Sequence, residues 1–350
     1  MASPFRLAAE WQQQGAVLMA WPHPGTDWAP VMERAEPVFR ALALAILASE
    51  DLIICCNNRS QCSDVRSIIK ARAQGKKLNG RLHTAVARTN DTWARDFGPL
   101  TLTNGHEHQL LDPCFNAWGN KFDASLDNRV NQTLHGQGYL GRLPMVTTPT
   151  VMEGGALETD GAGTLLTTRH SLLNPNRNGD VTAQWMEARL AGTLGISRVL
   201  WLENGQLDGD DTDGHIDTLA RFCSPGCILY QACDHHDDPH YPALRAMADE
   251  LRGFARADGA PYELIPLPWP EPVHAADGRR LPATYANFLI LNEAVLVPVY
   301  GVPQDEDACS ILARCFPQRR IEAIQCRPLL EQGGSLHCLT MQLPPGAVPP

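Results

Sequence analysis

The chain has 350 residues, of which 44% are hydrophobic and 19% are charged, as in a globular protein with a large core. Its net charge of −10 argues against nucleic acid as a partner, because nucleic-acid binding needs a basic face. No run approaches the ~18 apolar residues of a membrane span, and the first residues lack the features of a secretory signal, so we expect a cytoplasmic protein without membrane contact.

Apolar runs and helical spacing predict an alternation of strands and helices in the first half of the chain. The predicted strands cover residues 16–21, 52–56, 82–87, 100–102, 108–112 and 145–150. The predicted helices cover residues 33–49, 63–74 and 127–136.

The second half continues this pattern. Strands are predicted at 157–160, 164–168, 198–202, 218–222, 228–232, 263–267, 285–291, 294–300, 321–325 and 339–343, and helices at 182–194, 242–257 and 306–314. The recurring unit is strand, strand, helix, strand, and four such units of roughly 60–80 residues follow one another. The first strand and the last could complete a fifth. No break in composition divides the chain, so we expect one domain over residues 1–350.

A cysteine near the C-terminus stands where a glycine turn enters a strand, in the stretch Gly333–Thr340. In that position Cys338 is held on a rigid element with its sulfur facing outward, which suits a nucleophile. Taken alone, the stretch favours a buried cysteine that packs as a small hydrophobic residue, and the rest of the chain reverses that preference.

Three further polar clusters stand where strands begin or end, and they carry Asp96, Glu153, and His215 with Asp217. A barrel-like or propeller-like fold would bring them together with Cys338 at its centre. If residues 215–217 are extended, the side chains of His215 and Asp217 point to one face. The alternative is a solvated acidic loop, and a calcium loop is disfavoured because the EF-hand spacing fails.

Trp93 and Asp96 together suit a pocket for a planar cation. The alternative places Trp93 in the core and pairs Arg95 with Asp96. Glu153 could orient the histidine or cap a turn.

Two carboxylates, a histidine and a cysteine define a type of reaction. Carboxylates can bind the N–H groups of a guanidinium from either side, while a thiolate attacks its carbon. The histidine would protonate the departing nitrogen and then activate water. Carboxylates near Cys338 should raise the pKa of its thiol, and a bound cation should lower it again, so that the thiolate forms when substrate arrives.

These stretches resemble the agmatine deiminase family, which includes bacterial-type peptidylarginine deiminases. The matching segments, in the order of the family, are 21–23, 90–99, 153–155, 172–178, 211–217, 285–288 and 333–340. The resemblance implies the pentein fold, an α/β propeller of five ββαβ-type units around a pseudo-fivefold axis.

The resemblance also implies the reaction, which converts agmatine to N-carbamoylputrescine and ammonia through a covalent amidino-cysteine intermediate. It implies catalytic roles for Cys338 as nucleophile, His215 as general acid and base, and Glu153 as the residue that holds His215. The positions it implies for binding a small cationic guanidine substrate are Asp96, Asp217, Trp93, Asn287 and Asp211. No metal or organic cofactor is implied.

Several alternatives stay open from the sequence. Asp211 stands where agmatine deiminases carry a glutamate, so a different guanidine substrate, arginine or a peptidylarginine, stays open. The carboxylate of such a substrate would need a basic partner, for which Arg95, Arg177 and Arg169 are candidates. The run Cys233–His240 carries metal-ligand residue types, which raises a non-enzymatic metal-binding protein, although a solvated loop is the simpler interpretation. The complete set of site residues speaks against a pentein that binds without catalysis. A homodimer is left open.

Overall fold

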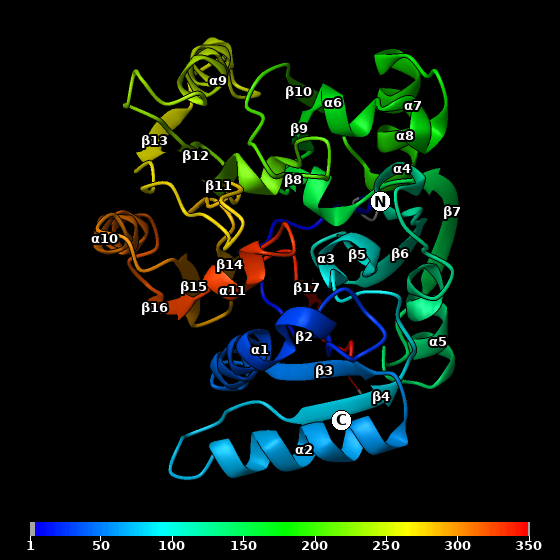
Figure 1. The fold of residues 1–350 in the computed structure, drawn as a ribbon. Helices are drawn as coiled ribbons and strands as arrows, with labels where there is room; N and C mark the ends of the chain where they lie inside the picture. Colours follow the sequence, from blue (N-terminus) through cyan, green and yellow to red (C-terminus); the bar gives the residue numbers. More distant parts are fainter. Residues whose placement is uncertain (1–3, 349–350) are drawn as a thin grey trace.

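A computed structural model describes residues 4–348 and contains five small sheets arranged around a common centre (Figure 1). Within each sheet an inner strand pairs antiparallel with a middle strand, which pairs parallel with a third, and one principal helix connects the two parallel strands. This is the predicted ββαβ unit repeated five times, and it confirms the expected pentein propeller.

The units, in the order inner strand, middle strand, helix, third strand, are as follows. The first has β17 (Thr340–Leu343), β2 (Ala16–Ala20), α1 (Met32–Leu47) and β3 (Asp51–Cys56). The second has β5 (Leu100–Thr103), β6 (His108–Cys114), α5 (Val130–Gly136) and β7 (Met145–Val151). The third has β8 (Glu158–Thr159), β9 (Thr164–Thr168), α8 (Ala183–Leu194) and β10 (Arg198–Leu202).

The last two units complete the ring. The fourth has β11 (Ala220–Ser224), β12 (Cys227–Gln231), α9 (Tyr241–Gly253) and β13 (Glu263–Leu267), and the fifth has β14 (Leu289–Ile290), β15 (Ala294–Val299), α10 (Asp305–Cys315) and β16 (Arg320–Gln325). Beyond these, α2 (Arg59–Arg72) and β4 (Leu82–Val86) extend the first sheet, and β1 (Arg6–Leu7) pairs with β5.

The two ends of the chain close the ring by sharing a sheet. β17 pairs antiparallel with β2, with Thr340 opposite Met19. The predicted fifth unit, built from the first strand and the strand after Cys338, is therefore confirmed. Closure in this way ties the position of Cys338 to the first sheet, so the cysteine is held by contacts from both ends of the sequence.

Local sequence explains where the helices begin and end. Thr182 caps α8, because its side chain accepts a hydrogen bond from the backbone N–H of Trp185, and Gly195 ends the helix at φ 64°. The side chain of Asn58 caps α2 in the same way, by accepting from the N–H of Gln61. Ser, Thr, Asn and Asp favour the first position and glycine the last, as these helices show.

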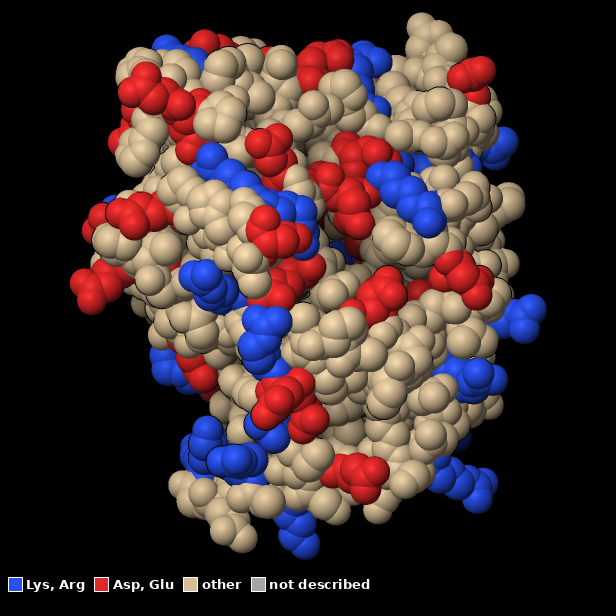
Figure 2. All heavy atoms as spheres, viewed as in Figure 1, with Lys and Arg blue, Asp and Glu red and all other residues tan. Residues whose placement is uncertain are grey.

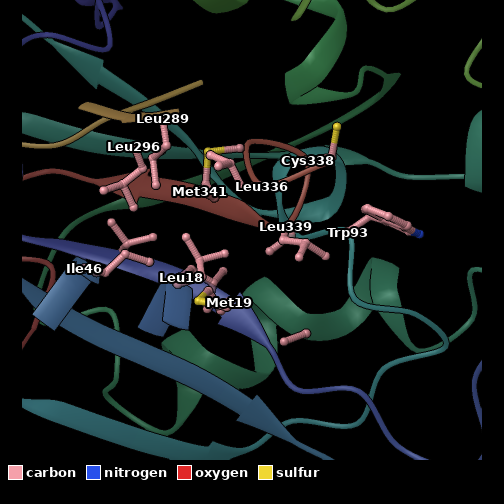
Figure 3. Packing of buried hydrophobic residues seen from close by; sticks show 14 of the residues in the cluster. Leu18, Met19, Ile46, Trp93, Leu289, Leu296, Leu336, Cys338, Leu339 and Met341 are labelled. Atoms are coloured by element: carbon pink, nitrogen blue, oxygen red, sulfur yellow. The ribbon is translucent and has the colours of Figure 1, made fainter. Parts of the chain in front are cut away.

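The principal core lies between β2, β3 and the helices and strands around them. All five residues of β2 are fully buried, and the last five residues of β3 are buried as well. Figure 3 shows Leu339 and Met341 within this cluster, whereas the sulfur of Cys338 points away from it. The core therefore fixes the backbone on either side of Cys338 and leaves its thiol for other contacts.

One condition considered in the sequence analysis is not met. Residues 215–217 are not extended: Ile216–Thr218 form the 3-10 helix η4, and β11 begins only at Ala220. The polar stretch lies at a tight turn into the inner strand, which a period-two pattern does not describe. In the part of the chain from residue 4 to residue 348, no helix is long and apolar enough to cross a membrane.

Candidate active site

Each of the five units contributes side chains to the site from the same place, a turn immediately before its inner strand. Asp96 lies in α3 (Ala94–Phe97) before β5, and Glu153 directly precedes η3 (Gly154–Ala156) before β8. His215 and Asp217 lie at η4 before β11, Asn287 lies before β14, and Cys338 lies before β17. The ring brings these turns together, because the inner strands all face its centre (Figure 1).

The site is crowded around Gly155. A Cβ atom placed on this glycine would lie 2.5 Å from His215 Nδ1, 2.8 Å from Asp96 Oδ1 and 3.2 Å from Asp217 Oδ2. His215 Nδ1 and Asp96 Oδ1 are themselves 3.5 Å apart. Three of the predicted site residues therefore meet around one backbone position where any side chain would displace them.

Cys338 joins this group through Asp217 and Asn287. Its sulfur lies 3.6 Å from Asp217 Oδ2, and Asn287 Nδ2 lies 3.2 Å from it. Burial raises the pKa of the Cys338 thiol well above its ordinary value, and the charges of Asp217 and Asp96 raise it further. This is the direction expected from the sequence, and it keeps the thiol protonated while no cation is bound.

His215 is buried between two carboxylates. Its Nε2 lies 3.4 Å from Glu153 Oε2, on the side of the ring opposite Asp96. Burial alone would lower the pKa of His215, but Asp96 and Glu153 outweigh it and raise that pKa to about 9. The imidazole is therefore protonated at neutral pH and can donate a proton.

Glu153 is itself held by Arg177. The Nε of Arg177 lies 2.7 and 2.9 Å from the two carboxylate oxygens of Glu153, and both side chains are fully buried. Arg177 also contacts Asp213 Oδ2 at 2.7 Å. Burial raises the pKa of Glu153, but His215 and Arg177 together hold it below its ordinary value. Glu153 is thus an ionised carboxylate facing the histidine.

The two acids near Cys338 differ in their partners. Asp96 accepts hydrogen bonds from the N–H of Gly155 at 2.9 Å and from Trp118 Nε1 at 3.0 Å, and burial raises its pKa to about 6. Asp217 Oδ2 lies 2.8 Å from His337 Nδ1, whereas its Oδ1 is buried with no hydrogen-bond partner in the described residues. Burial raises the pKa of Asp217, but His337 and His215 outweigh it and lower that pKa.

A cavity opens from this group to the surface. It encloses about 500 Å³ of empty space, part of it open to solvent. Its aromatic and acidic lining residues are Trp93, Trp118, Phe122, Asp27, Asp91, Asp96 and Asp211. No Lys or Arg is among the described residues that line it. Figure 2 shows acidic side chains gathered around the hollow at the centre of this face.

The glycine turn before Cys338 forms one wall of the cavity. A Cβ atom on Gly334 would come within 2.4 Å of the Trp93 ring, so only glycine permits this approach. Gly333 has φ 85° and faces Asp211 at the mouth. Trp93 in turn donates from Nε1 to Asp91 Oδ2 at 3.0 Å. The turn, the indole and the acids therefore form one continuous surface.

The three arginines considered for a substrate carboxylate are each paired with a glutamate and do not line the cavity. Arg177 is used by Glu153, Arg95 pairs with Glu10 at 3.1 Å rather than with Asp96, and Arg169 pairs with Glu203 at 2.5 Å. The alternative of an Arg95–Asp96 ion pair is therefore wrong.

The run Cys233–His240 is occupied by contacts within the protein. His240 Nδ1 lies 2.9 Å from Asp238 Oδ1, and Asp238 also binds Arg280 at 2.7 Å and Trp269 at 2.8 Å. Within residues 4–348 no group of three or more His, Cys, Asp or Glu side chains is placed to hold a metal ion. The metal-binding alternative therefore has no support from the arrangement of these side chains.

Sequence reasoning missed three residues that contact the site. Trp118 and His337 bind the two acids, and Glu10 lies behind His337 at 2.9 Å. His337 stands in a motif that the sequence marked, beside Cys338, but no role was assigned to it. Trp118 lies in a turn with left-handed backbone angles at Trp118 and Gly119. The adjacent tryptophan and glycine were the only feature of the sequence that indicated this turn.

Comparison with known proteins agrees with this geometry. The sequence model of the Porphyromonas-type peptidyl-arginine deiminase family matches residues 6–344. The chain is 33% identical to an agmatine deiminase of Ectopseudomonas mendocina, over 98% of this chain and 96% of the relative.

Two solved structures have the same fold over nearly their whole length. The agmatine deiminase of C. jejuni, solved with substrate bound, has a TM-score of 0.88 and 34% identity, and the match covers 97% of this chain and 96% of that chain. A candidate arginine deiminase from Porphyromonas gingivalis has a TM-score of 0.91 and 44% identity, and the match covers 99% and 100%. The family match and these relatives confirm the resemblance seen in the sequence: this chain belongs to the Porphyromonas-type peptidyl-arginine deiminase family.

Proposed function

We propose that this chain hydrolyses agmatine to N-carbamoylputrescine and ammonia. Its family makes it an enzyme that acts on the C–N bond of a guanidine group. The observation that carries the choice of agmatine is the cavity above Cys338, which is lined by four carboxylates and by no Lys or Arg among the described residues. A substrate with a cationic group at each end fits such a cavity, because each end meets an acid.

The guanidinium is held between Asp96 and Asp217. Asp217 Oδ2 lies 3.6 Å from the sulfur of Cys338, and Oδ1 has no hydrogen-bond partner in the described chain, so this carboxylate can accept from guanidinium N–H groups. Asp96 contributes the opposing carboxylate. The indole of Trp93 also lines the cavity, and a flat cation packs well against an aromatic face. Asp211, at the mouth, is the acid available to the distal amine.

Cys338 is the nucleophile. Arrival of the cation offsets the repulsion that Asp217 and Asp96 exert on a thiolate, so the thiol releases its proton to solvent when substrate is bound. The thiolate bonds to the guanidinium carbon and produces a tetrahedral adduct. Asn287, which touches both the sulfur and Asp217, keeps the two groups aligned.

His215 supplies the protons. As an imidazolium it protonates one nitrogen, and ammonia leaves with the electrons of the C–N bond, which produces the S-amidino intermediate. The neutral imidazole then takes a proton from water, whose oxygen bonds to the same carbon. As the C–S bond breaks, the proton of the new hydroxyl group passes to the departing sulfur, which restores the thiol and releases the carbamoyl product. Glu153 favours the imidazolium and fixes the ring.

Arginine is the second candidate, and one observation favours it: the Porphyromonas gingivalis structure named for that activity is 44% identical, against 34% for the agmatine deiminase of C. jejuni. Against it, arginine carries a carboxylate that would meet acids in this cavity. Ammonia release from agmatine, arginine and a peptide with C-terminal arginine, with Cys338→Ala as control, tests the choice. Higher kcat/KM for arginine or the peptide would contradict agmatine as the substrate.

We also propose a cytoplasmic location. All eleven cysteines are free thiols in the structure, which suits a reducing compartment.

A further inference from the structure

His337, the residue before Cys338, lies between two carboxylates. Its Nδ1 is 2.8 Å from Asp217 Oδ2, and its Nε2 is 2.9 Å from Glu10 Oε1. The side chain is only 1% exposed, so water does not compete for either nitrogen. Both ring nitrogens thus lie at hydrogen-bond distance from a carboxylate, and the plane of the ring is fixed from both ends. Donation to both carboxylates requires the imidazolium, which Glu10 and Asp217 favour, whereas burial, Arg221 and Arg95 oppose it and lower the pKa of His337.

The carboxylate of Glu10, which comes from the other end of the chain, is itself held in place by several donors. It binds Arg95 at 3.1 Å, Arg221 at 2.5 Å and Gln342 Nε2 at 2.9 Å. Arg221 is fully buried and also pairs with Glu158 at 2.6 Å. A carboxylate with this many donors has little freedom to turn, so it can hold the ring in place.

The contact matters because the carboxylate of Asp217 is used asymmetrically. Its Oδ2 is engaged by His337 and by Asn287 Nδ2 at 3.2 Å, whereas its Oδ1 is buried with no partner in residues 4–348. An unpartnered buried oxygen is unfavourable, and a carboxylate free to rotate would avoid it by sharing its donors. A further contact must therefore hold the Asp217 carboxylate in the observed orientation, with Oδ1 unpartnered.

We propose that His337 is a positioning residue which, braced by Glu10, fixes the orientation in which the Asp217 carboxylate, beside Cys338, binds the guanidinium. The inference rests on the proposed function, in which Asp217 binds the guanidinium. It gives the N-terminal segment around Glu10 a part in substrate binding, although that segment does not line the cavity above Cys338.

Two amide variants separate the two ends of the ring. The side-chain nitrogen of asparagine takes roughly the place of Nδ1, and that of glutamine the place of Nε2. His337→Asn therefore keeps the donor to Asp217 and loses the Glu10 contact, whereas His337→Gln keeps the Glu10 contact and loses the donor. A residue that only fills space would not distinguish these variants in this way.

The test measures agmatine binding by calorimetry in a Cys338→Ala background, where no turnover occurs, together with kcat and KM in the active enzyme. We expect His337→Asn to bind within about threefold of its parent and His337→Gln to bind about 10- to 100-fold more weakly, the range for loss of a hydrogen bond to a charged group. KM should follow the same order.

The inference is overturned if the two variants bind agmatine equally. It is also overturned if the loss of affinity in each variant simply follows the fall in its melting temperature. If the Cys338→Ala parent does not bind agmatine at all, the proposed substrate fails and takes the inference with it, which is a distinguishable result. Should His337→Gln fail to fold, Glu10→Gln replaces it: weaker agmatine binding supports the brace, and unchanged binding contradicts it.

Discussion

The hydrogen bond from Trp118 to Asp96 allows a sharp prediction on the pH dependence of activity. Burial raises the pKa of Asp96 to about 6, while the indole N–H of Trp118, 3.0 Å from Oδ2, opposes this by stabilising the ionised form. Only the ionised carboxylate can bind a guanidinium as proposed. Activity should therefore rise as pH increases through the pKa of Asp96.

Trp118→Phe removes the donor and keeps an aromatic ring in the cavity. A hydrogen bond to a charged group contributes about 1.5–3 kcal/mol, and about 1.4 kcal/mol corresponds to one pH unit. The pKa of Asp96 should rise further, which moves the acid limb of kcat/KM upward by about one to two pH units. At pH 6.5 the variant should lose activity that it regains at pH 8.5.

Trp93→Phe is the matched control, because it removes an indole from the same cavity whose N–H binds Asp91 instead of Asp96. Its acid limb should stay where the unmodified enzyme has it. The assay is ammonia release from agmatine between pH 5 and 9. The reasoning is refuted if Trp118→Phe lowers kcat/KM equally at every pH, or if both variants move the acid limb alike.

Three further predictions follow from buried contacts. Arg177→Met leaves the buried Glu153 with only His215 as a cationic partner among the described residues and should lower the free energy of unfolding by about 3–5 kcal/mol in urea denaturation at pH 7; a loss under 1 kcal/mol would contradict the importance of the Arg177 pair. Gly155→Ala places a methyl group 2.5 Å from His215 Nδ1 and should reduce kcat/KM by about 100-fold or more with little change in melting temperature; near-normal activity would show that the site is less crowded than described. Without substrate, iodoacetamide should alkylate Cys338 more slowly than it alkylates glutathione at pH 7.5, as followed by peptide mass spectrometry, because burial and nearby acids keep the thiol protonated; faster alkylation would contradict substrate-assisted ionisation.

The sequence predicted most of the architecture because the repeating unit has a clear periodicity. Strands 198–202 and 263–267 match the structure at both ends, and the closure of the ring by residues 339–343 follows from the unit count. The local structure of residues 215–217 could not be decided from the sequence, because three residues in a tight turn have no periodicity to detect.

The site was predicted to the extent that its residues carry reactive groups. Cys338, His215 and Asp96 carry reactive groups, but each also has a structural alternative in the sequence, and the resemblance to a known family favours the functional one. Trp118 and Glu10 cannot be recognised in this way, because their contribution depends on which carboxylate or ring they meet across the ring of sheets. Such contacts join segments far apart in the sequence, and local pattern does not encode them.

The account depends most directly on a covalent bond between Cys338 and the guanidinium carbon. Mass spectrometry of the enzyme quenched during turnover of agmatine tests it, with Cys338→Ala treated in parallel. We predict an amidine-sized adduct on the peptide that contains Cys338, absent from the variant and lost as substrate is exhausted. An adduct on another residue, or steady turnover by Cys338→Ala, would contradict the mechanism.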